Sequence, residues 1–204
     1  MNTTQPKTQK PTAMYVHGLG SGAYSSTFRD LSLRFPQYIW GMSEYSEDLA
    51  ANVKKIEQFA AKIQPSLIVA SSMGALALLF AKVPEHTIKV LHNPALSLAD
   101  SVRNTIGLGK HNYFCRRLDH KIEFELTEQM CCDYENFIAT HEPQLSRENY
   151  AIFSEHDELL GDAATAAARN YVENFGFKVF TDAESGHRIT PKSYEIIATE
   201  ILAE

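Results

Sequence analysis

Two adjacent serines are the first residues of this sequence whose types and spacing suit a chemical reaction. They lie in IVASSMGALALLF, residues 68–80, between a short apolar run and a longer one. A serine at a sharp turn from a buried strand into a helix presents its hydroxyl as a nucleophile for acyl transfer. Such a turn packs tightly, so the residues two before and two after the nucleophile must be small. Ser72 has Ala70 and Gly74 at these places, whereas Ser71 has two larger side chains, and the pattern therefore favours Ser72.

A serine nucleophile needs a base, and the base needs a carboxylate that orients it. His187 is the candidate base, because it lies in the loop DAESGHRIT after the last apolar run. Asp157 is the candidate acid, in SEHDELLGD after the preceding run, and Glu155, Glu158 and Asp162 are its rivals. Serine, acid and histidine then follow one another in the chain order that accompanies this type of turn.

Acyl transfer also requires N–H donors for the oxyanion that forms in the transition state. The backbone amide of Met73, directly after the nucleophile, is one candidate donor. The loop HGLGSGAYSST supplies a second, and its three glycines let the amide of Leu19 approach a substrate closely. These glycines alternate and no lysine follows them, so the loop does not match a phosphate-binding pattern. His17 is expected to brace the loop, because His187 already occupies the position of the base.

The elements that must position these residues follow from the hydrophobic pattern. Six compact apolar runs rich in branched and aromatic residues are typical of buried strands: residues 14–18, 37–41, 66–71, 88–93, 149–154 and 177–181. Amphipathic or apolar helical segments alternate with them, and one of these begins at a predicted cap, Ser46, and stops at Pro65. The alternation predicts an α/β fold with a mostly parallel sheet of about six strands and helices on both faces.

Residues 97–146 interrupt this alternation, because they contain no convincing strand. A structureless loop of that length is uncommon in a compact domain, so we expect a helical insertion that acts as a lid. Residues 13–204 are predicted to form a single domain with this insertion. Residues 1–12 are predicted to be a flexible tail, since they lack the apolar stretch of a signal peptide or membrane anchor.

Composition limits the partners that the chain can recognise. The 204 residues carry 19 Lys and Arg against 25 Asp and Glu, a net charge of −6, which argues against nucleic acid and against a membrane surface. The three cysteines lack the spacing of a disulfide or zinc framework, and the protein is therefore expected in the cytoplasm. Acyl transfer by a serine requires neither a metal nor an organic cofactor, and His111, His120 and His141 lack the spacing of a metal site. Composition gives no oligomeric state.

Five motifs together carry a resemblance to a known family: MYVHGLGSG, IVASSMGA, LHNPA, SEHDELL and SGHRIT. In order and spacing they resemble the YqiA-like small esterases of the α/β-hydrolase superfamily, over nearly the whole chain. The resemblance implies an α/β-hydrolase fold, Ser72, Asp157 and His187 as catalytic triad, and the amides of Leu19 and Met73 as oxyanion donors. It also implies a carboxylesterase for small, short-acyl substrates.

Other reactions and roles fit the same residues. A thioesterase, or a lyase that uses the triad to abstract a proton, would need the same scaffold, because a fold does not fix the reaction. A binding protein without turnover is a further alternative. An ester or a thioester is the expected small-molecule substrate in the two hydrolase cases.

Overall fold

A computed structural model describes residues 10–203 of the chain. Its centre is a six-stranded sheet in the order β2-β1-β3-β4-β7-β8, in which every neighbouring pair is parallel. The strands are β1 (Thr12–Val16), β2 (Ile39–Gly41), β3 (Leu67–Ser71), β4 (Ile88–His92), β7 (Glu148–Ser154) and β8 (Lys178–Asp182). All six apolar runs thus form strands, as the sequence predicts.

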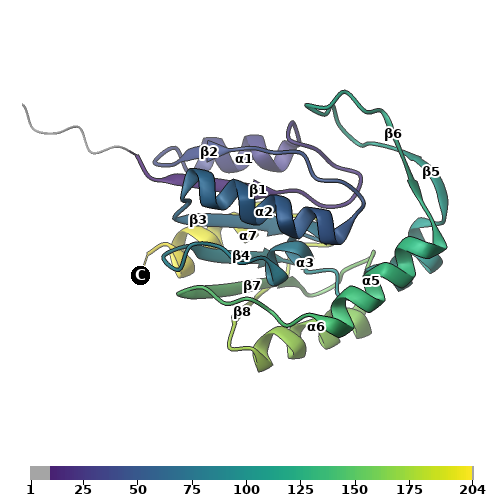
Figure 1. The fold of residues 1–204 in the computed structure, drawn as a ribbon. Coiled ribbons are helices and arrows are strands. Elements are labelled where there is room, and N and C mark those ends of the chain that lie inside the picture. The colour runs from purple at the N-terminus through teal and green to yellow at the C-terminus, as the bar shows by residue number, and fades with distance from the viewer. Residues whose placement is uncertain (1–9, 204) are drawn as a thin grey trace, which may run out of the picture.

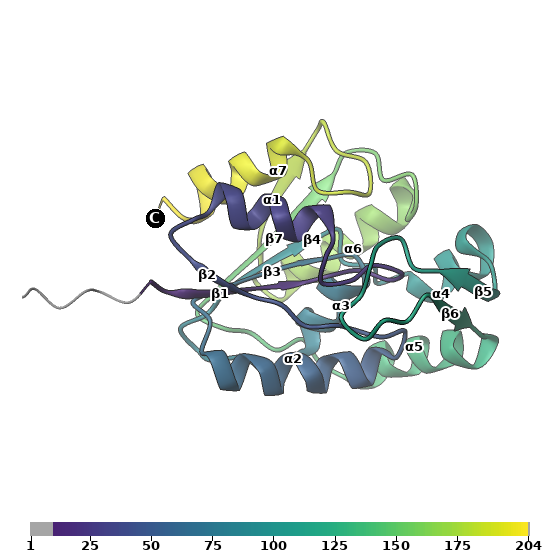
Figure 2. The same ribbon diagram turned by 90° about the horizontal axis from the view of Figure 1, so that it is seen from above.

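Helices cover both faces of the sheet, so that it forms the middle of three layers (Figures 1 and 2). One face carries α1 (Ser26–Arg34), α7 (Pro191–Ile196) and the π-helical turn η2 (Ile197–Ile201). The other face carries α2 (Leu49–Ile63), α3 (Met73–Phe80) and α6 (Asp162–Asn174). The sequence analysis did not single out α1, whose only buried residue is Leu31.

Alternation of side chains along each strand divides the core between these two layers. On β1, Ala13 and Tyr15 belong to the cluster under α1 and α7, whereas Met14 and Val16 belong to the cluster under α2 and α3. Successive side chains of a strand point to opposite faces, so a sheet covered on both sides needs unbroken apolar runs. The helix α3 is buried at every position, which explains its apolar composition all round.

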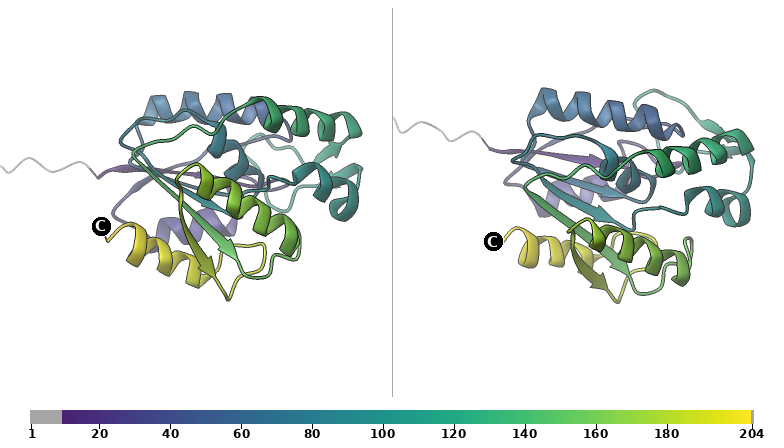
Figure 3. Two further views of the ribbon diagram at one scale, coloured as in Figure 1. Left: turned by 90° about the horizontal axis from the view of Figure 1, so that it is seen from below. Right: turned by 60° about the horizontal axis from the view of Figure 1, so that its bottom comes forward.

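The insertion lies between β4 and β7, at the end of the sheet to which the strands run (Figures 1 and 3). It contains α4 (Leu98–Ser101), the π-helical turn η1 (Val102–Ile106), the antiparallel pair β5 (Gly109–Asn112) and β6 (Glu123–Leu126), and α5 (Glu128–Thr140). The insertion thus contains the expected helices, but the expectation that it has no strand was wrong. The two strands are short, polar and half exposed, with Phe124 and Leu126 as the buried positions of β6, so they lack the apolar run of a central strand.

The predicted start of α2 is also wrong. Its N-cap is Asp48, whose carboxylate accepts a hydrogen bond from the amide of Ala51 at 2.9 Å. Ser46 lies before the helix, and its amide instead donates to the Asn52 side chain at 2.8 Å. Both residue types are good caps, so residue type could not decide between them.

The division of the chain into a tail of residues 1–12 and a single domain of residues 13–204 stays a prediction. The strand β1 begins at Thr12, and residues 1–9, on which most of the predicted tail falls, lie outside the described residues. No helix within residues 10–203 has both the length and the apolar composition needed to cross a membrane.

Candidate active site

Ser72 occupies a strained turn between β3 and α3. Its backbone has φ 54° and ψ −126°, and a positive φ is unfavourable for any residue with a side chain. Gly74 explains how the turn packs, because a Cβ atom there would lie 2.5 Å from the carbonyl oxygens of both Val16 and His17. The glycine two residues after the serine is therefore required by the close approach of α3 to the end of β1. Two residues before the serine, the methyl group of Ala70 is fully buried, so the turn accommodates it.

Three side chains converge at this turn from separate loops. His187 Nε2 lies 2.9 Å from Ser72 Oγ, and His187 Nδ1 lies 2.8 Å from Asp157 Oδ2. A carboxylate only accepts, so Nδ1–H donates to Asp157, and Nε2 is then free to accept the proton of the Ser72 hydroxyl. The structure thus brings together the three residues that the sequence analysis selected.

The rival residues point elsewhere. Ser71 Oγ lies 2.9 Å from the hydroxyl of Tyr15, on the side of the sheet that faces α1. Glu155 and Asp162 are exposed, and Glu158 binds the backbone amide of His187, at 2.8 Å, rather than the imidazole. Among the described residues, the hydrogen bonds of the His187 ring go to Asp157 and Ser72 and not to these three carboxylates.

The Asp157 carboxylate is buried and held in place by its own loop. Its Oδ1 accepts hydrogen bonds from the amides of Leu159 and Leu160, at 3.0 and 2.8 Å. Burial by itself would raise the pKa of Asp157, but the hydrogen bond and charge of His187, with the two amides, outweigh it and hold the pKa below its ordinary value. The carboxylate is therefore ionised and oriented before a substrate arrives.

Two buried polar residues that the sequence analysis did not assign hold the loop of His187. Asn93, at a positive φ of 44° directly after β4, donates from its side-chain nitrogen to the carbonyls of Gly186 and His187, each at 3.3 Å. Asp182, the last residue of β8, accepts from Thr190 Oγ1 at 2.7 Å and so fixes the other end of the loop. Their signal in the sequence is a polar residue at the end of a buried strand.

The two predicted oxyanion donors belong to segments that adjoin Ser72. Met73 is the first residue of α3, so its amide has no partner within the helix. Gly18 packs directly on the serine, since a Cβ atom at Gly18 would lie 3.0 Å from Ser72 Cβ. Leu19 follows at once and lines the same cavity as Ser72 and His187. The role of the two amides as oxyanion donors stays a prediction.

A cavity of about 820 Å³ opens over Ser72 and is lined by both apolar and hydroxyl-bearing residues. The apolar lining residues include Leu98, Ile106, Phe114 and Phe124 of the insertion, with Leu159 and Leu160. The hydroxyl-bearing lining residues include Tyr15, Ser21, Ser25, Ser26 and Thr27. The insertion therefore supplies part of the wall of the cavity. Among residues 10–203, no group of three or more His, Cys, Asp and Glu side chains has the arrangement of a metal site.

The architecture matches solved structures over nearly the whole chain. A monoacylglycerol lipase of Paleococcus ferrophilus has a TM-score of 0.62 at 14% identity, covering 92% of this chain and 91% of the lipase. Mouse alpha/beta hydrolase domain-containing protein 10 has a TM-score of 0.63 at 12% identity, and the match covers 94% of this chain and 88% of the mouse chain. Est1E from Butyrivibrio proteoclasticus has a TM-score of 0.62 at 11% identity, and the match covers 94% of this chain and 85% of Est1E. No family model and no curated protein matches the sequence.

These likenesses, together with the six-stranded parallel sheet and its helices, define the class of fold. The chain has the α/β-hydrolase fold. Sequence identities this low show the fold alone, so the chemistry has to be argued from the residues of the site.

Proposed function

We propose that the protein is a serine hydrolase that cleaves a carboxylic ester of a small, short-acyl substrate through an acyl-enzyme intermediate. The observation that carries the proposal is the continuous contact from Ser72 Oγ through the His187 ring to Asp157, at 2.9 and 2.8 Å. The order and spacing of the five sequence motifs further support a place among the YqiA-like small esterases.

The mechanism has two steps of acyl transfer. Ser72 Oγ attacks the ester carbonyl while its proton passes to His187 Nε2, and Asp157 stabilises the imidazolium that results. The oxyanion is bound by the amides of Leu19 and Met73. His187 then protonates the leaving alcohol, and a water molecule deprotonated by the same imidazole releases the acyl group.

The lining of the cavity supports an ester with apolar and polar parts. Its apolar residues suit the acyl chain, and its hydroxyl groups offer hydrogen bonds to a polar alcohol. The volume of about 820 Å³ exceeds what a short acyl group needs, so there is also room for part of the alcohol. The insertion acts as a lid in this proposal, because it supplies several of the apolar lining residues.

Labelling with a fluorophosphonate and hydrolysis of p-nitrophenyl esters graded by chain length test the proposal. Ser72→Ala should abolish labelling and lower ester turnover by several orders of magnitude. Ser71→Ala is the matched control and should retain most of both, since Ser71 contacts Tyr15 instead of His187. A wild-type protein that is neither labelled nor active would instead favour a binding protein, and equal losses in the two variants would exclude Ser72 as the nucleophile.

A further inference from the structure

The loop that carries the Leu19 amide has two backbone hydrogen bonds of its own, from Ser21 to the carbonyl of Gly18, at 3.3 Å, and from Ser25 to the carbonyl of Gly22, at 3.1 Å. Three of its first six residues are the glycines at 18, 20 and 22, which offer no side chain for packing and have a flexible backbone. A displacement of about 1 Å in a catalytic group is enough to lower turnover strongly. The position of this amide therefore depends on contacts that other segments make with the loop.

Those contacts come from the insertion and from Glu44. The amide of Phe114 donates to the carbonyl of Gly20, at 2.8 Å, and Arg117 Nη1 donates to the carbonyl of Ser21, also at 2.8 Å. Glu44 Oε1 accepts from the amide of Ala23, at 3.1 Å. Three successive points of the loop after Leu19 are thus held by residues that lie outside it.

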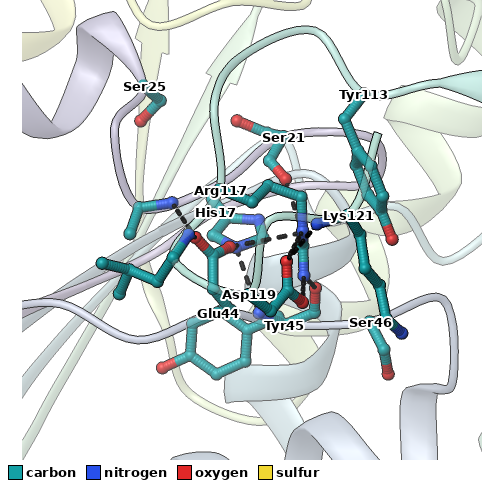
Figure 4. A network of polar contacts seen from close by, with 12 residues as sticks. His17, Ser21, Ser25, Glu44, Tyr45, Ser46, Tyr113, Arg117, Asp119 and Lys121 are labelled. Atoms are coloured by element: carbon teal, nitrogen blue, oxygen red, sulfur yellow. Dashed lines mark hydrogen bonds and ion pairs between the residues drawn. The ribbon is translucent and has the colours of Figure 1, made fainter. Parts of the chain in front are cut away.

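Glu44 and Arg117 form the centre of a buried polar network (Figure 4). Their side chains are only 6% and 2% exposed, and Arg117 Nη1 lies 3.3 Å from Glu44 Oε2. The same carboxylate accepts from the amide of Leu118, at 2.6 Å, and lies 3.2 Å from His17 Nε2. Glu44 therefore connects the start of the glycine loop at His17, its end at Ala23, and the insertion at Leu118.

Arg117 uses the rest of its guanidinium to fix the network. It donates to the carbonyl of Tyr45 at 3.0 Å and pairs with both carboxylate oxygens of Asp119, at 2.9 and 2.8 Å. Its guanidinium also lies over the ring of Tyr113, at 4.1 Å. A bidentate pair with further carbonyl acceptors requires the planar fork of arginine, which lysine does not have.

The fit at Gly22 shows how closely the loop and the network approach. A Cβ atom at this position would lie 2.9 Å from Arg117 Cγ and 3.1 Å from Glu44 Oε2. At the other end of the loop, Gly18 contacts Ser72 with similar closeness. The segment that holds the Leu19 amide is therefore fixed at one end by the nucleophile and at the other by Glu44 and Arg117.

We propose that Glu44 and Arg117 are positioning residues, which hold the glycine loop so that the Leu19 amide faces the oxyanion formed at Ser72. The inference rests on the proposed ester hydrolysis and adds to it a coupling between the insertion and the oxyanion site. Neither side chain lines the cavity over Ser72, so both act through the loop and not on the substrate.

Glu44→Gln is the decisive variant, because it keeps the shape of the side chain and removes the charge that Arg117 faces. Deleting one oxyanion donor lowers kcat by about 10²–10³-fold, and a displaced donor should lower it by about 10–100-fold. KM should change less than about threefold, since the ground state makes little use of the donor. Arg117→Lys should also lower kcat, and it replaces Glu44→Gln as the test variant if Glu44→Gln does not fold.

A boronic acid separates positioning from a general effect on stability. Its boron bonds to Ser72 Oγ, the serine proton passes to His187, and the tetrahedral adduct carries its negative charge at the oxyanion site without losing a group. Its inhibition constant should therefore rise in the variants by about the factor by which kcat falls, as for a transition-state analogue. Arg103→Lys is the matched control, since Arg103 pairs with Glu128 and Glu135 on the exposed side of the same insertion.

The outcomes distinguish this inference from the proposed function. A wild-type protein without turnover and without labelling of Ser72 would refute the ester hydrolase itself. If the wild type is active, an unchanged kcat in a folded Glu44→Gln or Arg117→Lys variant overturns the positioning role. A lower kcat with an unchanged inhibition constant for the boronic acid also overturns it, and so does an equal loss in Arg103→Lys.

Discussion

Replacing Asp157 with asparagine tests how the structure orients the imidazole. Asp157 Oδ1 is held by two backbone amides, those of Leu159 and Leu160, which need an acceptor. In Asp157→Asn the amide oxygen must take this position, and the NH₂ group must take that of Oδ2, 2.8 Å from His187 Nδ1. The NH₂ group then donates to Nδ1, and the ring carries its proton on Nε2, where it faces Ser72 Oγ.

The expected loss of kcat follows from this change of tautomer. An imidazole protonated on Nε2 cannot accept the proton of the serine, and it has also lost the negative charge that stabilises the imidazolium. The same exchange in a Ser-His-Asp triad lowers kcat about 10⁴-fold, so we expect a loss of about 10³–10⁴-fold here. That loss corresponds to about 4–5.5 kcal/mol of transition-state stabilisation.

Turnover of a p-nitrophenyl ester by Asp157→Asn measures the effect, with a thermal unfolding curve to show that the variant is folded. Glu155→Gln is the matched control, because Glu155 is exposed and lies only two residues away. Glu158→Gln should also cost little, since a glutamine oxygen can still accept from the amide of His187. Activity of Asp157→Asn within tenfold of the wild type would refute the orientation argument.

Two further predictions concern stability. Lys89→Met should lower the free energy of unfolding by about 2–4 kcal/mol, because the buried Lys89 Nζ donates to the carbonyls of Leu78, Ala81 and Gln144 and its loss removes this donor from all three, of which Leu78 still accepts from the Ala81 amide. Denaturant unfolding measures this effect, and an equal effect of the exposed control Lys82→Met would contradict it. Asp182 has a pKa below its ordinary 3.8, since the hydrogen bonds of Ser193, Thr190 and the Glu184 amide outweigh its burial. The ionised carboxylate therefore stabilises the fold above pH 3.8, and this stabilisation is lost as the pH falls below that value. The difference in unfolding free energy between the wild type and Asp182→Asn should accordingly become smaller below pH 3.8. A difference that does not depend on pH would count against this reasoning.

Much of the fold could be predicted because its signals are local. A strand buried on both faces needs an unbroken apolar run, and each of the six runs provides one. The turn at Ser72 needs small residues at fixed offsets, which Ala70 and Gly74 supply within five positions of sequence. The hairpin of the insertion escaped prediction because β5 and β6 are short and polar, and their pairing depends on segments separated along the chain.

Other features were decided by contacts between distant segments. Ser46 and Asp48 are both suitable caps by residue type. In the folded chain Asp48 is the cap, and the loop before α2 contacts a distant segment through the Tyr134 hydroxyl, which donates to the carbonyl of Glu47. Nothing near Glu44 in the sequence indicates that it accepts from the amide of Leu118, which lies 74 residues further along the chain.

The sequence by itself determined the six strands of the central sheet, their alternation with helices, and the identity of Ser72, Asp157 and His187, which converge at one edge of the sheet. It could do so because chain order and the end of each parallel strand bring these residues to one edge of the sheet. Only the tertiary structure decided the contacts that hold them: Asn93 on the loop of His187, and Glu44 with Arg117 on the glycine loop. Such contacts depend on how separate loops pack together in space. The residues that make them are therefore not spaced along the chain in any regular pattern that the sequence could reveal.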